Sequence, residues 1–267
     1  MKKNKPGKYF SGTRTEMDKI RISVVRYANS YPFVWGLKHG GLDDEAIIET
    51  DHPAVCAEKL AGGRADIGLV PVAALPEINN YKIISNYCIG AYRKVKTVML
   101  LSNSSFEDIN NIYLDYRSRS SVALARVLAQ FMWKRKFEWA STNEGFDFIN
   151  IAPGEAVVLI GDQCFELEPH FAFGLDLAEE WKRYTGLCFV FACWISNREI
   201  DDSFLMRFNS TLKSGLDNID RVVDYFRGSC AMNDEQLKSY LHNNIDYNFD
   251  EDKKRSMKLF LELISRL

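Results

Sequence analysis

The chain has 267 residues, of which 46% are hydrophobic and 26% are charged, and its formal net charge at pH 7 is -2. These values are typical of a globular protein of one or two domains with a sizeable core. The charge gives no reason to expect nucleic acid or a membrane surface as a partner, and the longest apolar runs, such as Cys188–Ile195, are too short to cross a bilayer.

The first segment of the chain, residues 1–16, is basic and polar and lacks the apolar stretch of a secretory signal. We expect a disordered extension there, with Met17 as an alternative start. Six cysteines without a CxxC pair favour reduced thiols, which predicts a cytoplasmic protein. The four histidines lack the spacing of metal ligands, so no metal site is predicted.

Short apolar strands alternate with helices from Lys19 onward. Capping and breaking residues mark several boundaries, because Asn29-Ser30 precedes a helix with proline in its first turn and Gly62-Gly63 ends another helix. The elements predicted in the first part of the chain are strand 20–25, helix 32–39, strand 46–50, helix 54–61, strand 65–71, strand 83–89 and strand 95–102.

The alternation continues as far as Ile195 and the pattern then changes. From Leu205 to Val223 and from Met257 to Leu267, apolar residues recur at i, i+3 and i+4, which predicts a helical C-terminal segment without strands. The elements predicted before that segment are strand 112–114, helix 122–133, strand 156–160, strand 171–175, helix 177–184 and strand 188–195.

Alternating strands and helices predict an α/β fold with mainly parallel sheets covered by helices. The number of predicted strands is larger than a single compact lobe requires. We therefore interpret the apolar strands 95–102 and 188–195 as crossings between two lobes. Ligands of open α/β sheets bind beyond the carboxyl ends of the strands, which in a two-lobed chain is the cleft between the lobes. The predicted division is lobe 1 over 17–103 plus 197–267 and lobe 2 over 104–196.

The most informative stretch is Leu114–Leu128, where a strand gives way to a helix through a polar segment. The exposed N–H groups and positive dipole end of a helix N-terminus, together with hydroxyl and guanidinium groups, suit a carboxylate or phosphate. Alternatively, Ser120 or Ser121 only caps the helix and both arginines are solvated. The residues of this segment predicted to bind a ligand are Ser118, Arg119, Ser120 and Ser121.

Other strand ends add hydroxyl and amide groups to the same cleft. Each also has a structural alternative: Asn29-Ser30 as a helix cap, Asp162 as a turn residue, and Thr97 as a packed strand residue. The set contains no histidine–carboxylate pair, no serine–histidine pair and no close pair of carboxylates, so it predicts a site that binds and orients a small polyoxygenated anion. The cleft residues predicted from these strand ends are Tyr27, Asn29, Ser30, Pro71, Thr97 and Asp162.

The chain also resembles a known family through a series of motifs, in order and with natural spacing over about residues 19–225. That family is chorismate dehydratase of the futalosine route to menaquinone, which has the periplasmic-binding-protein-like type II fold. The motifs that carry the resemblance are 27–32 (YANSYP), 65–72 (ADIGLVPV), 87–91 (YCIGA), 95–98 (VKTV), 113–124 (YLDYRSRSSVAL), 160–162 (IGD) and 181–192 (WKRYTGLCFVFA).

The chain departs from the family pattern at four places. The family usually has leucine where Ala28 stands, threonine where Ser120 stands and proline where Cys188 stands. It also commonly has a glycine around residues 92–94, which is absent here, so the shape of the loop before Thr97 does not follow from the resemblance.

The resemblance implies an enzyme, a hydro-lyase that removes water from chorismate to give 3-(1-carboxyvinyloxy)benzoate. Aromatisation drives this reaction, so it implies no metal and no organic cofactor, and orientation and carboxylate neutralisation supply most of the acceleration. Asn29 and Thr97 are then expected to be catalytic, by orienting the enolpyruvyl group and the departing hydroxyl. A substrate carboxylate is a candidate proton acceptor.

Two alternatives remain at this point. The same fold serves non-catalytic proteins that bind small carboxylates. The sister enzyme of the same pathway, dihydroxynaphthoate synthase, is expected to use a histidine base, whereas none of the four histidines here falls in a predicted cleft-facing motif. The sequence does not indicate an oligomeric state.

Overall fold

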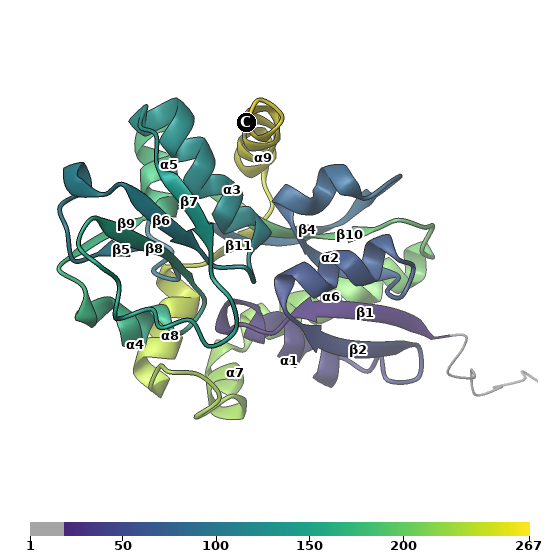
Figure 1. Ribbon diagram of the computed structural model, residues 1–267. Coiled ribbons are helices and arrows are strands. Elements are labelled where there is room, and N and C mark those ends of the chain that lie inside the picture. The colour runs from purple at the N-terminus through teal and green to yellow at the C-terminus, as the bar shows by residue number, and fades with distance from the viewer. Residues whose placement is uncertain (1–18) are drawn as a thin grey trace, which may run out of the picture.

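The computed structural model describes residues 19–267, which form two sheets side by side (Figure 1). The expected extension over residues 1–16 lies outside the described residues. In the first sheet the strand order is β11-β4-β10-β3-β1-β2. Its strands are β1 (Ile20–Val25), β2 (Ala46–Asp51), β3 (Ile67–Pro71), β4 (Lys82–Ala91), β10 (Phe189–Ser196) and β11 (Asp246–Asn248).

The second sheet has the order β7-β6-β8-β5-β9 and is built from one continuous part of the chain. Its strands are β5 (Val98–Ser102), β6 (Asn111–Leu114), β7 (Glu138–Ser141), β8 (Glu155–Ile160) and β9 (Phe173–Asp176). We call each sheet with its covering helices a lobe. The two lobes together give the α/β, two-lobed architecture that the sequence predicts.

Helices cover the faces of both sheets. In the first lobe, α2 packs on β3 and β1, and α6 packs on α1 and β4; in the second lobe, α3 packs on β8 and α5 on β5 and β9. The helices are α1 (Tyr31–His39), α2 (Pro53–Ala61), α3 (Arg119–Val127), α4 (Cys164–Leu167), α5 (Leu177–Thr185), α6 (Asp202–Asp217), α7 (Ile219–Tyr225), α8 (Asp234–Asn243) and α9 (Glu251–Ile264).

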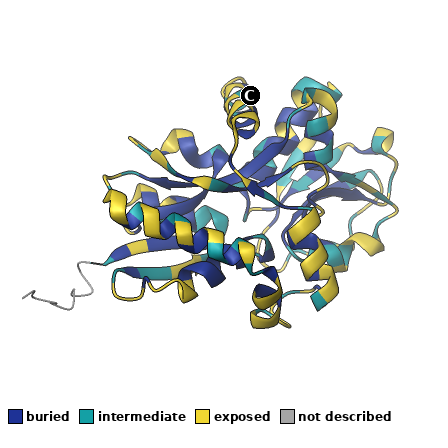
Figure 2. Cartoon of the chain, turned by 180° about the vertical axis from the view of Figure 1, so that it is seen from behind, coloured by how far each residue is buried: buried dark blue, intermediate teal, exposed yellow. Residues whose placement is uncertain are grey.

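The hydrophobic core follows from the alternation of side chains along the strands. On β5, Leu100 joins the large core that runs through both lobes, whereas Met99 and Leu101 point to the other face and join a small cluster with Val157 and Leu159. Figure 2 shows the buried residues gathered in the sheets and the exposed ones on the outer faces of the helices.

Side-chain caps define several helix starts. Asp176 accepts hydrogen bonds from the N–H groups of Ala178 and Glu179 and thereby starts α5, and Asn233 and Gln236 form a reciprocal capping box at the start of α8. The N-cap of α3 is Ser118, so the helix begins at Arg119 and not at Val122 as predicted. The N-cap alternatives Ser120 and Ser121 are therefore wrong.

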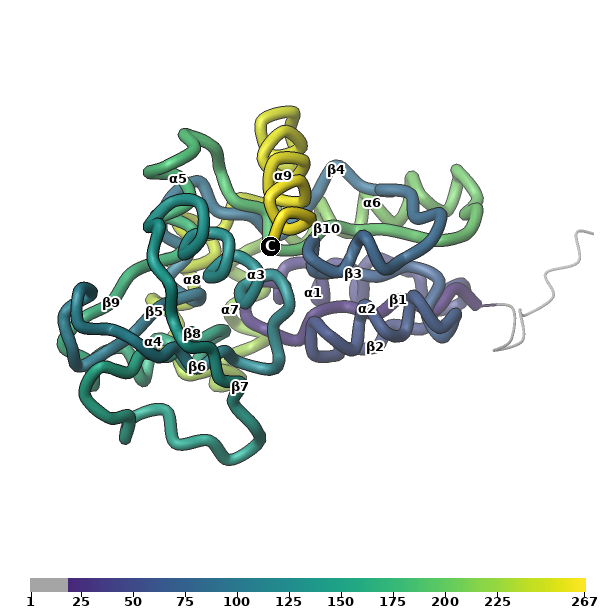
Figure 3. Tube along the Cα trace, turned by 45° about the horizontal axis from the view of Figure 1, so that its top comes forward, coloured from purple at the N-terminus to yellow at the C-terminus, as the bar shows by residue number. Residues whose placement is uncertain are grey.

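The C-terminal segment ties the lobes together. Helix α9 packs against β10 of the first lobe and α3 of the second, and in Figure 3 it stands above the junction. The expectation of a purely helical tail is wrong, because Asp246–Asn248 form β11 at the edge of β4. A three-residue polar strand gives no periodic signal, so only its partner strand defines it.

The pairing directions also differ from the prediction of mainly parallel sheets. Of the nine strand pairings found within residues 19–267, five are antiparallel. Strand β10 returns from the second lobe antiparallel to both β3 and β4, because it enters the sheet from the opposite end. The alternation of elements fixes their order but not the direction in which a chain re-enters a sheet.

Strand membership places the crossings a few residues earlier than the predicted lobe boundaries. β5 pairs with β8 and β9 in the second sheet, and β10 belongs wholly to the first. The chain therefore passes between the sheets within residues 92–97 and 186–188, and not at 103–104 and 196–197. By sheet membership, we propose to assign β5 to the second lobe and β10 to the first.

Two glycines allow helices α1 and α6 to cross with backbones in contact. A Cβ on Gly215 would overlap the carbonyl oxygen of Pro32, and a Cβ on Gly36 would overlap that of Thr211. Both glycines are buried. Helix α1 follows the Tyr27–Ser30 segment directly, so this contact also sets where the end of β1 lies.

Candidate functional site

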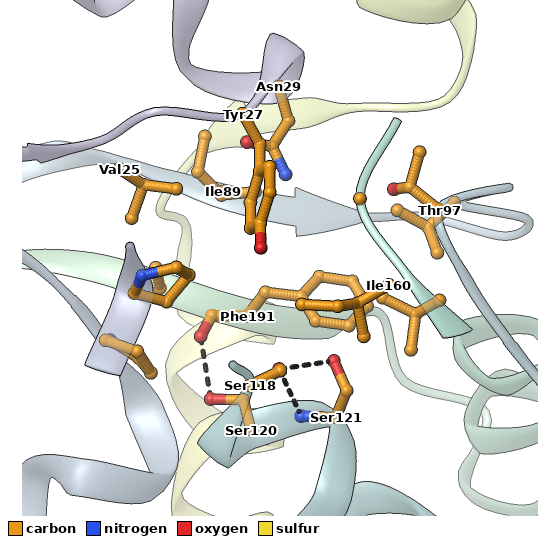
Figure 4. Close-up of a pocket in the computed structure, with 16 residues that line it drawn as sticks. Val25, Tyr27, Asn29, Ile89, Thr97, Ser118, Ser120, Ser121, Ile160 and Phe191 are labelled. Atoms are coloured by element: carbon orange, nitrogen blue, oxygen red, sulfur yellow. Dashed lines mark hydrogen bonds between the residues drawn. The ribbon is translucent and has the colours of Figure 1, made fainter. Parts of the chain in front are cut away.

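A buried pocket of about 50 Å³ lies where the two lobes meet. The first lobe contributes the ends of β1 and β3 and part of β10, and the second contributes the start of α3 and the end of β8 (Figure 4). Thr97, in the crossing segment 92–97, completes the wall. Seven of the predicted cleft residues line the pocket: Tyr27, Asn29, Pro71, Thr97, Ser118, Ser120 and Ser121.

Three serines at the N-terminus of α3 line the pocket, and two of them, Ser118 and Ser121, are hydrogen-bonded to each other. Ser118 Oγ accepts a hydrogen bond from the N–H of Ser121 at 3.2 Å, and it donates its proton to Ser121 Oγ at 2.8 Å. The proton of the Ser121 hydroxyl is thereby left to point toward a ligand. The N–H groups of Arg119 and Ser120, in the first helical turn, precede the first intrahelical hydrogen bond and add positive potential.

Ser120 has a different environment from its neighbours. Its hydroxyl donates to the carbonyl oxygen of Phe191 at 3.0 Å and accepts from the N–H of Ala73 at 3.2 Å. Both partners belong to the first lobe, whereas Ser120 belongs to the second. The hydroxyl of Ser120 therefore joins the lobes across the floor of the pocket, which Figure 4 shows for the bond to Phe191.

The opposite wall carries two buried polar atoms that have no hydrogen-bond partner in the described part of the chain, Tyr27 Oη and Asn29 Oδ1. In Figure 4 the Tyr27 hydroxyl points into the pocket, with the Asn29 amide beside it. Burial raises the pKa of Tyr27, so its hydroxyl stays protonated and can donate. Buried polar atoms without partners cost free energy unless a ligand pairs with them, which marks this wall as a binding surface.

Tyr27 is held in place by a glycine from the other lobe. Gly161 has a φ of 75°, in the left-handed region that glycine adopts without cost, and a Cβ there would come within 3.0 Å of Tyr27 Cε1. The N–H of Gly161 donates to the carbonyl oxygen of Thr97 at 2.9 Å. Tyr27, Gly161 and Thr97 thus meet at one point of the lobe junction.

The loop before Thr97 has a definite shape although the family glycine is absent. Lys96 takes a left-handed φ of 63°, and its N–H donates to Asp176 Oδ2 at 2.7 Å. A non-glycine residue in this region is strained by about 1–2 kcal/mol. The buried carboxyl of Asp176 offsets that strain and so fixes the backbone that carries Thr97.

Three predicted cleft residues are not part of the lining. Ser30 is fully buried and donates to the carbonyl oxygens of Val25 and Tyr27, as a turn-forming residue does. Arg119 forms an ion pair with Glu77 on the surface. Asp162 accepts from the N–H of Ala28 at 3.1–3.2 Å, and so joins the lobes one layer behind the pocket.

Asp162 leads to a prediction on pH dependence. Burial raises its pKa to about 6, against the opposing effect of the Ala28 N–H. A carboxyl whose pKa is higher in the folded than in the unfolded state stabilises the fold below about pH 4 and loses that contribution as the pH rises toward about 6. Asp162→Asn removes the titration. We expect the variant to gain stability relative to the wild type over this range, by up to about 3 kcal/mol.

The measurement is urea unfolding of both proteins at several values between about pH 4 and pH 7. The difference in free energy of unfolding should grow up to about pH 6 and then level off. A difference that shrinks with rising pH would show that the ionised carboxylate stabilises the fold.

Sequence reasoning missed two polar features near the pocket. Arg117 forms a two-bond ion pair with the fully buried Asp115, with Nε–Oδ1 at 2.8 Å and Nη2–Oδ2 at 2.6 Å. His52 packs edge to face on Tyr27, with ring centroids 6.1 Å apart, and its buried Nδ1 has no hydrogen-bond partner in the described part of the chain. His52 follows β2, so extending the strand-end argument to that strand would have found it. The apolar floor, including Ile89, Ile160 and Phe191, had no sequence signal of its own.

Within residues 19–267 no group of three or more His, Cys, Asp or Glu side chains is arranged to hold a metal ion. All six cysteines are unpaired. No helix in the described range is long and apolar enough to cross a membrane.

The model of a family described as menaquinone biosynthesis matches residues 20–266. Among solved structures, the chain is similar to protein AF1704 from Archaeoglobus fulgidus, with 16% identity, coverage of 94% of this chain and 98% of that one, and a TM-score of 0.74. It is also similar to the periplasmic aliphatic sulphonate binding protein SsuA from Escherichia coli, with 14% identity, coverage of 93% and 92%, and a TM-score of 0.62. These likenesses confirm the periplasmic-binding-protein-like fold that the sequence predicts.

Proposed function

The chain belongs to the menaquinone biosynthesis family, and from this premise we propose that it is a chorismate dehydratase that converts chorismate to 3-(1-carboxyvinyloxy)benzoate and water. The observation that carries the proposal is the set of hydrogen-bonding groups on the two walls of the pocket. One wall presents the N-terminus of α3 with the Ser121 hydroxyl, and the other presents the unpartnered Tyr27 hydroxyl and Asn29 amide oxygen. Chorismate carries two carboxylates and a ring hydroxyl, which such a set can pair.

We propose that the N-terminus of α3 binds a substrate carboxylate. The Ser121 proton and the N–H groups of the first turn are donors, and hydrogen bonds to a charged group are the strong ones. The Tyr27 hydroxyl is a further donor, whereas Asn29 Oδ1 is an acceptor that suits a substrate hydroxyl. The pocket therefore distinguishes a hydroxy acid from a plain carboxylate.

The reaction needs a proton acceptor and a way to release hydroxide. The proton leaves the ring carbon that bears the enolpyruvyl ether, its electron pair forms a ring double bond, and the neighbouring C–O bond breaks; the departing hydroxide then takes up the abstracted proton, so that one water is released. The side chains that line the pocket are apolar, hydroxyl or amide groups. We propose that a carboxylate of the substrate takes the proton, while Asn29 and Thr97 orient the enolpyruvyl group and the departing hydroxyl.

Access to the pocket requires the lobes to separate. A volume of about 50 Å³ is little more than the space of one or two water molecules, which is too small for chorismate. The contacts that must open include the Ser120 bridge to Phe191 and Ala73. Closure around the substrate would exclude water and align the donors described above.

The two serines at the start of α3 lead to a prediction. Replacing both Ser120 and Ser121 with alanine should weaken chorismate binding by about 1–3 kcal/mol, the size expected for hydrogen bonds to a charged group. In the single variants we expect Ser121→Ala to carry the loss of affinity. Ser120→Ala, which removes an interlobe bridge, should mainly lower the melting temperature. Calorimetric titration and thermal unfolding measure the two effects, and unchanged affinity in the double variant would contradict the assignment.

The experiment that tests the function is incubation of the purified protein with chorismate, with detection of the benzoate product by its absorbance and mass. Conversion with water as the other product supports the proposal. Chorismate binding without conversion would instead support a non-catalytic binding protein. If the protein neither binds nor converts chorismate, the sister reaction, dihydroxynaphthoate synthesis, becomes the candidate.

The unpaired cysteines fit a reducing compartment, and we propose that the protein works in the cytoplasm.

A further inference from the structure

The C-terminal segment reaches the pocket from behind. Tyr240 on α8 places its hydroxyl 2.9 Å from Thr97 Oγ1, Tyr247 on β11 donates to the carbonyl oxygen of Asn29 at 3.0 Å, and Asn244 donates to the carbonyl oxygen of Lys94 at 2.9 Å. These three side chains therefore contact both candidate catalytic residues and the crossing segment between the lobes. The sequence pattern of the tail indicated helices only and left its role open.

The hydrogen bond between Tyr240 and Thr97 can run in either direction, and the environment of Tyr240 favours one of them. Its side chain is 1% exposed and its ring packs edge to face on Phe165, with centroids 5.4 Å apart. Burial raises its pKa well above the ordinary value, so the hydroxyl remains protonated. The structure gives this hydroxyl one partner, Thr97 Oγ1. If Thr97 donated, the Tyr240 proton would be left without a partner in the interior, whereas if Tyr240 donates, the Thr97 proton faces the pocket, where a ligand can accept it; we therefore take Thr97 as the acceptor.

This direction determines what Thr97 can do. A threonine hydroxyl has one proton, and when its oxygen accepts from Tyr240 the proton is free to point elsewhere. Thr97 lines the pocket, and its backbone is held by the Gly161 N–H and, next to it, by the Lys96–Asp176 hydrogen bond. These hydrogen bonds hold the backbone, so the orientation of the hydroxyl is the freedom that Tyr240 removes.

We propose that Tyr240 is a positioning residue that holds the Thr97 hydroxyl as a hydrogen-bond donor toward an oxygen of the ligand that gains negative charge. The inference rests on the proposed function, because Thr97 is assigned there to the departing hydroxyl. A chain of two hydrogen bonds in one direction, from Tyr240 to Thr97 to the ligand, polarises the second bond and strengthens it.

The test is a double-mutant cycle on turnover with Tyr240→Phe and Thr97→Val. Tyr240→Phe keeps the ring against Phe165 and removes only the hydroxyl. We expect a five- to tenfold lower kcat with KM changed less than twofold, and no further loss when Tyr240→Phe is added to Thr97→Val. In a Thr97→Ser background, which keeps the hydroxyl, Tyr240→Phe should again lower kcat.

Tyr31→Phe is the matched control. Tyr31 is also buried, and its hydroxyl donates to the carbonyl oxygen of Ser229 at 3.2 Å outside the pocket. It should lower the melting temperature about as much as Tyr240→Phe does and leave kcat unchanged. In an active enzyme, an unchanged kcat in Tyr240→Phe, or multiplied losses in the double variant, would overturn the positioning role alone. A wild type that does not convert chorismate would overturn both this role and the proposed function.

Discussion

Replacing Asn29 with alanine is expected to lower the turnover of chorismate at least tenfold, which corresponds to about 1.4 kcal/mol of transition-state stabilisation. Asn29 lines the pocket with an amide oxygen that has no hydrogen-bond partner among residues 19–267, so its hydrogen-bonding capacity is available to the substrate. Its backbone carbonyl is held by Tyr247, which a change of side chain does not remove. Thr97→Val, which keeps the shape of the side chain and removes its hydroxyl, is expected to have an effect of the same size.

Steady-state kinetics and thermal unfolding of the same preparations distinguish catalysis from packing. If either variant loses melting temperature but keeps its turnover per folded molecule, then Asn29 serves as a helix cap or Thr97 as a packed strand residue. The side chain of Asn29 makes no cap hydrogen bond to α1, which agrees with a functional role. Asp162→Asn is not a suitable control here, because it changes a contact between the lobes directly behind the pocket.

The largest effect on stability is expected from Gly215→Ala. A Cβ at this position would overlap the backbone carbonyl of Pro32 in α1, and backbone cannot move aside as the end of a side chain can. Overpacking in a core typically costs about 1–3 kcal/mol, and contact with backbone places this variant at or above that range. We therefore expect a loss of about 3 kcal/mol or more in the free energy of unfolding, measured with urea.

Ser210→Ala on the same helix is the matched control, because Ser210 is exposed and alanine suits a helix. It should change stability by less than about 0.5 kcal/mol. A Gly215→Ala protein as stable as this control would mean that α1 and α6 can separate at no cost. In that case the position of the Tyr27–Ser30 segment would not depend on the helix crossing.

The site could be predicted to the extent that it is built from strand ends. β1 has the residues predicted for it, and the parallel strands β1 and β3 end at the same edge of the first sheet, where the start of α3, from the second lobe, completes the pocket. The prediction could not say which hydroxyls are free. Ser120 and Ser121 are adjacent and chemically alike, yet only the fold shows that Ser120 is engaged by Phe191 and Ala73.

Other features depend on contacts between distant parts of the chain. Tyr240 is hydrogen-bonded to Thr97, and Tyr247 to Asn29. The two residues of each pair are far apart in the sequence, so no local sequence pattern predicts these contacts. Arg119 resembled a ligand-binding group in sequence, but helix geometry turns it outward to Glu77. Strand β11 is too short to show alternation and exists because β4 offers it an edge.

The division of the sheets sets the order in which this chain can fold. All five strands of the second sheet lie within residues 98–176, so they are present before β10 has been synthesised. The first sheet contains β1, but it cannot be completed until β10 has been synthesised and pairs with β3 and β4. Strand β11, which pairs with β4, is synthesised later still. Until then a nascent chain exposes an unpaired edge of β3, the kind of surface that recruits other strands into aggregates. The lobe that contains β1 is therefore completed after the lobe that contains β5 to β9.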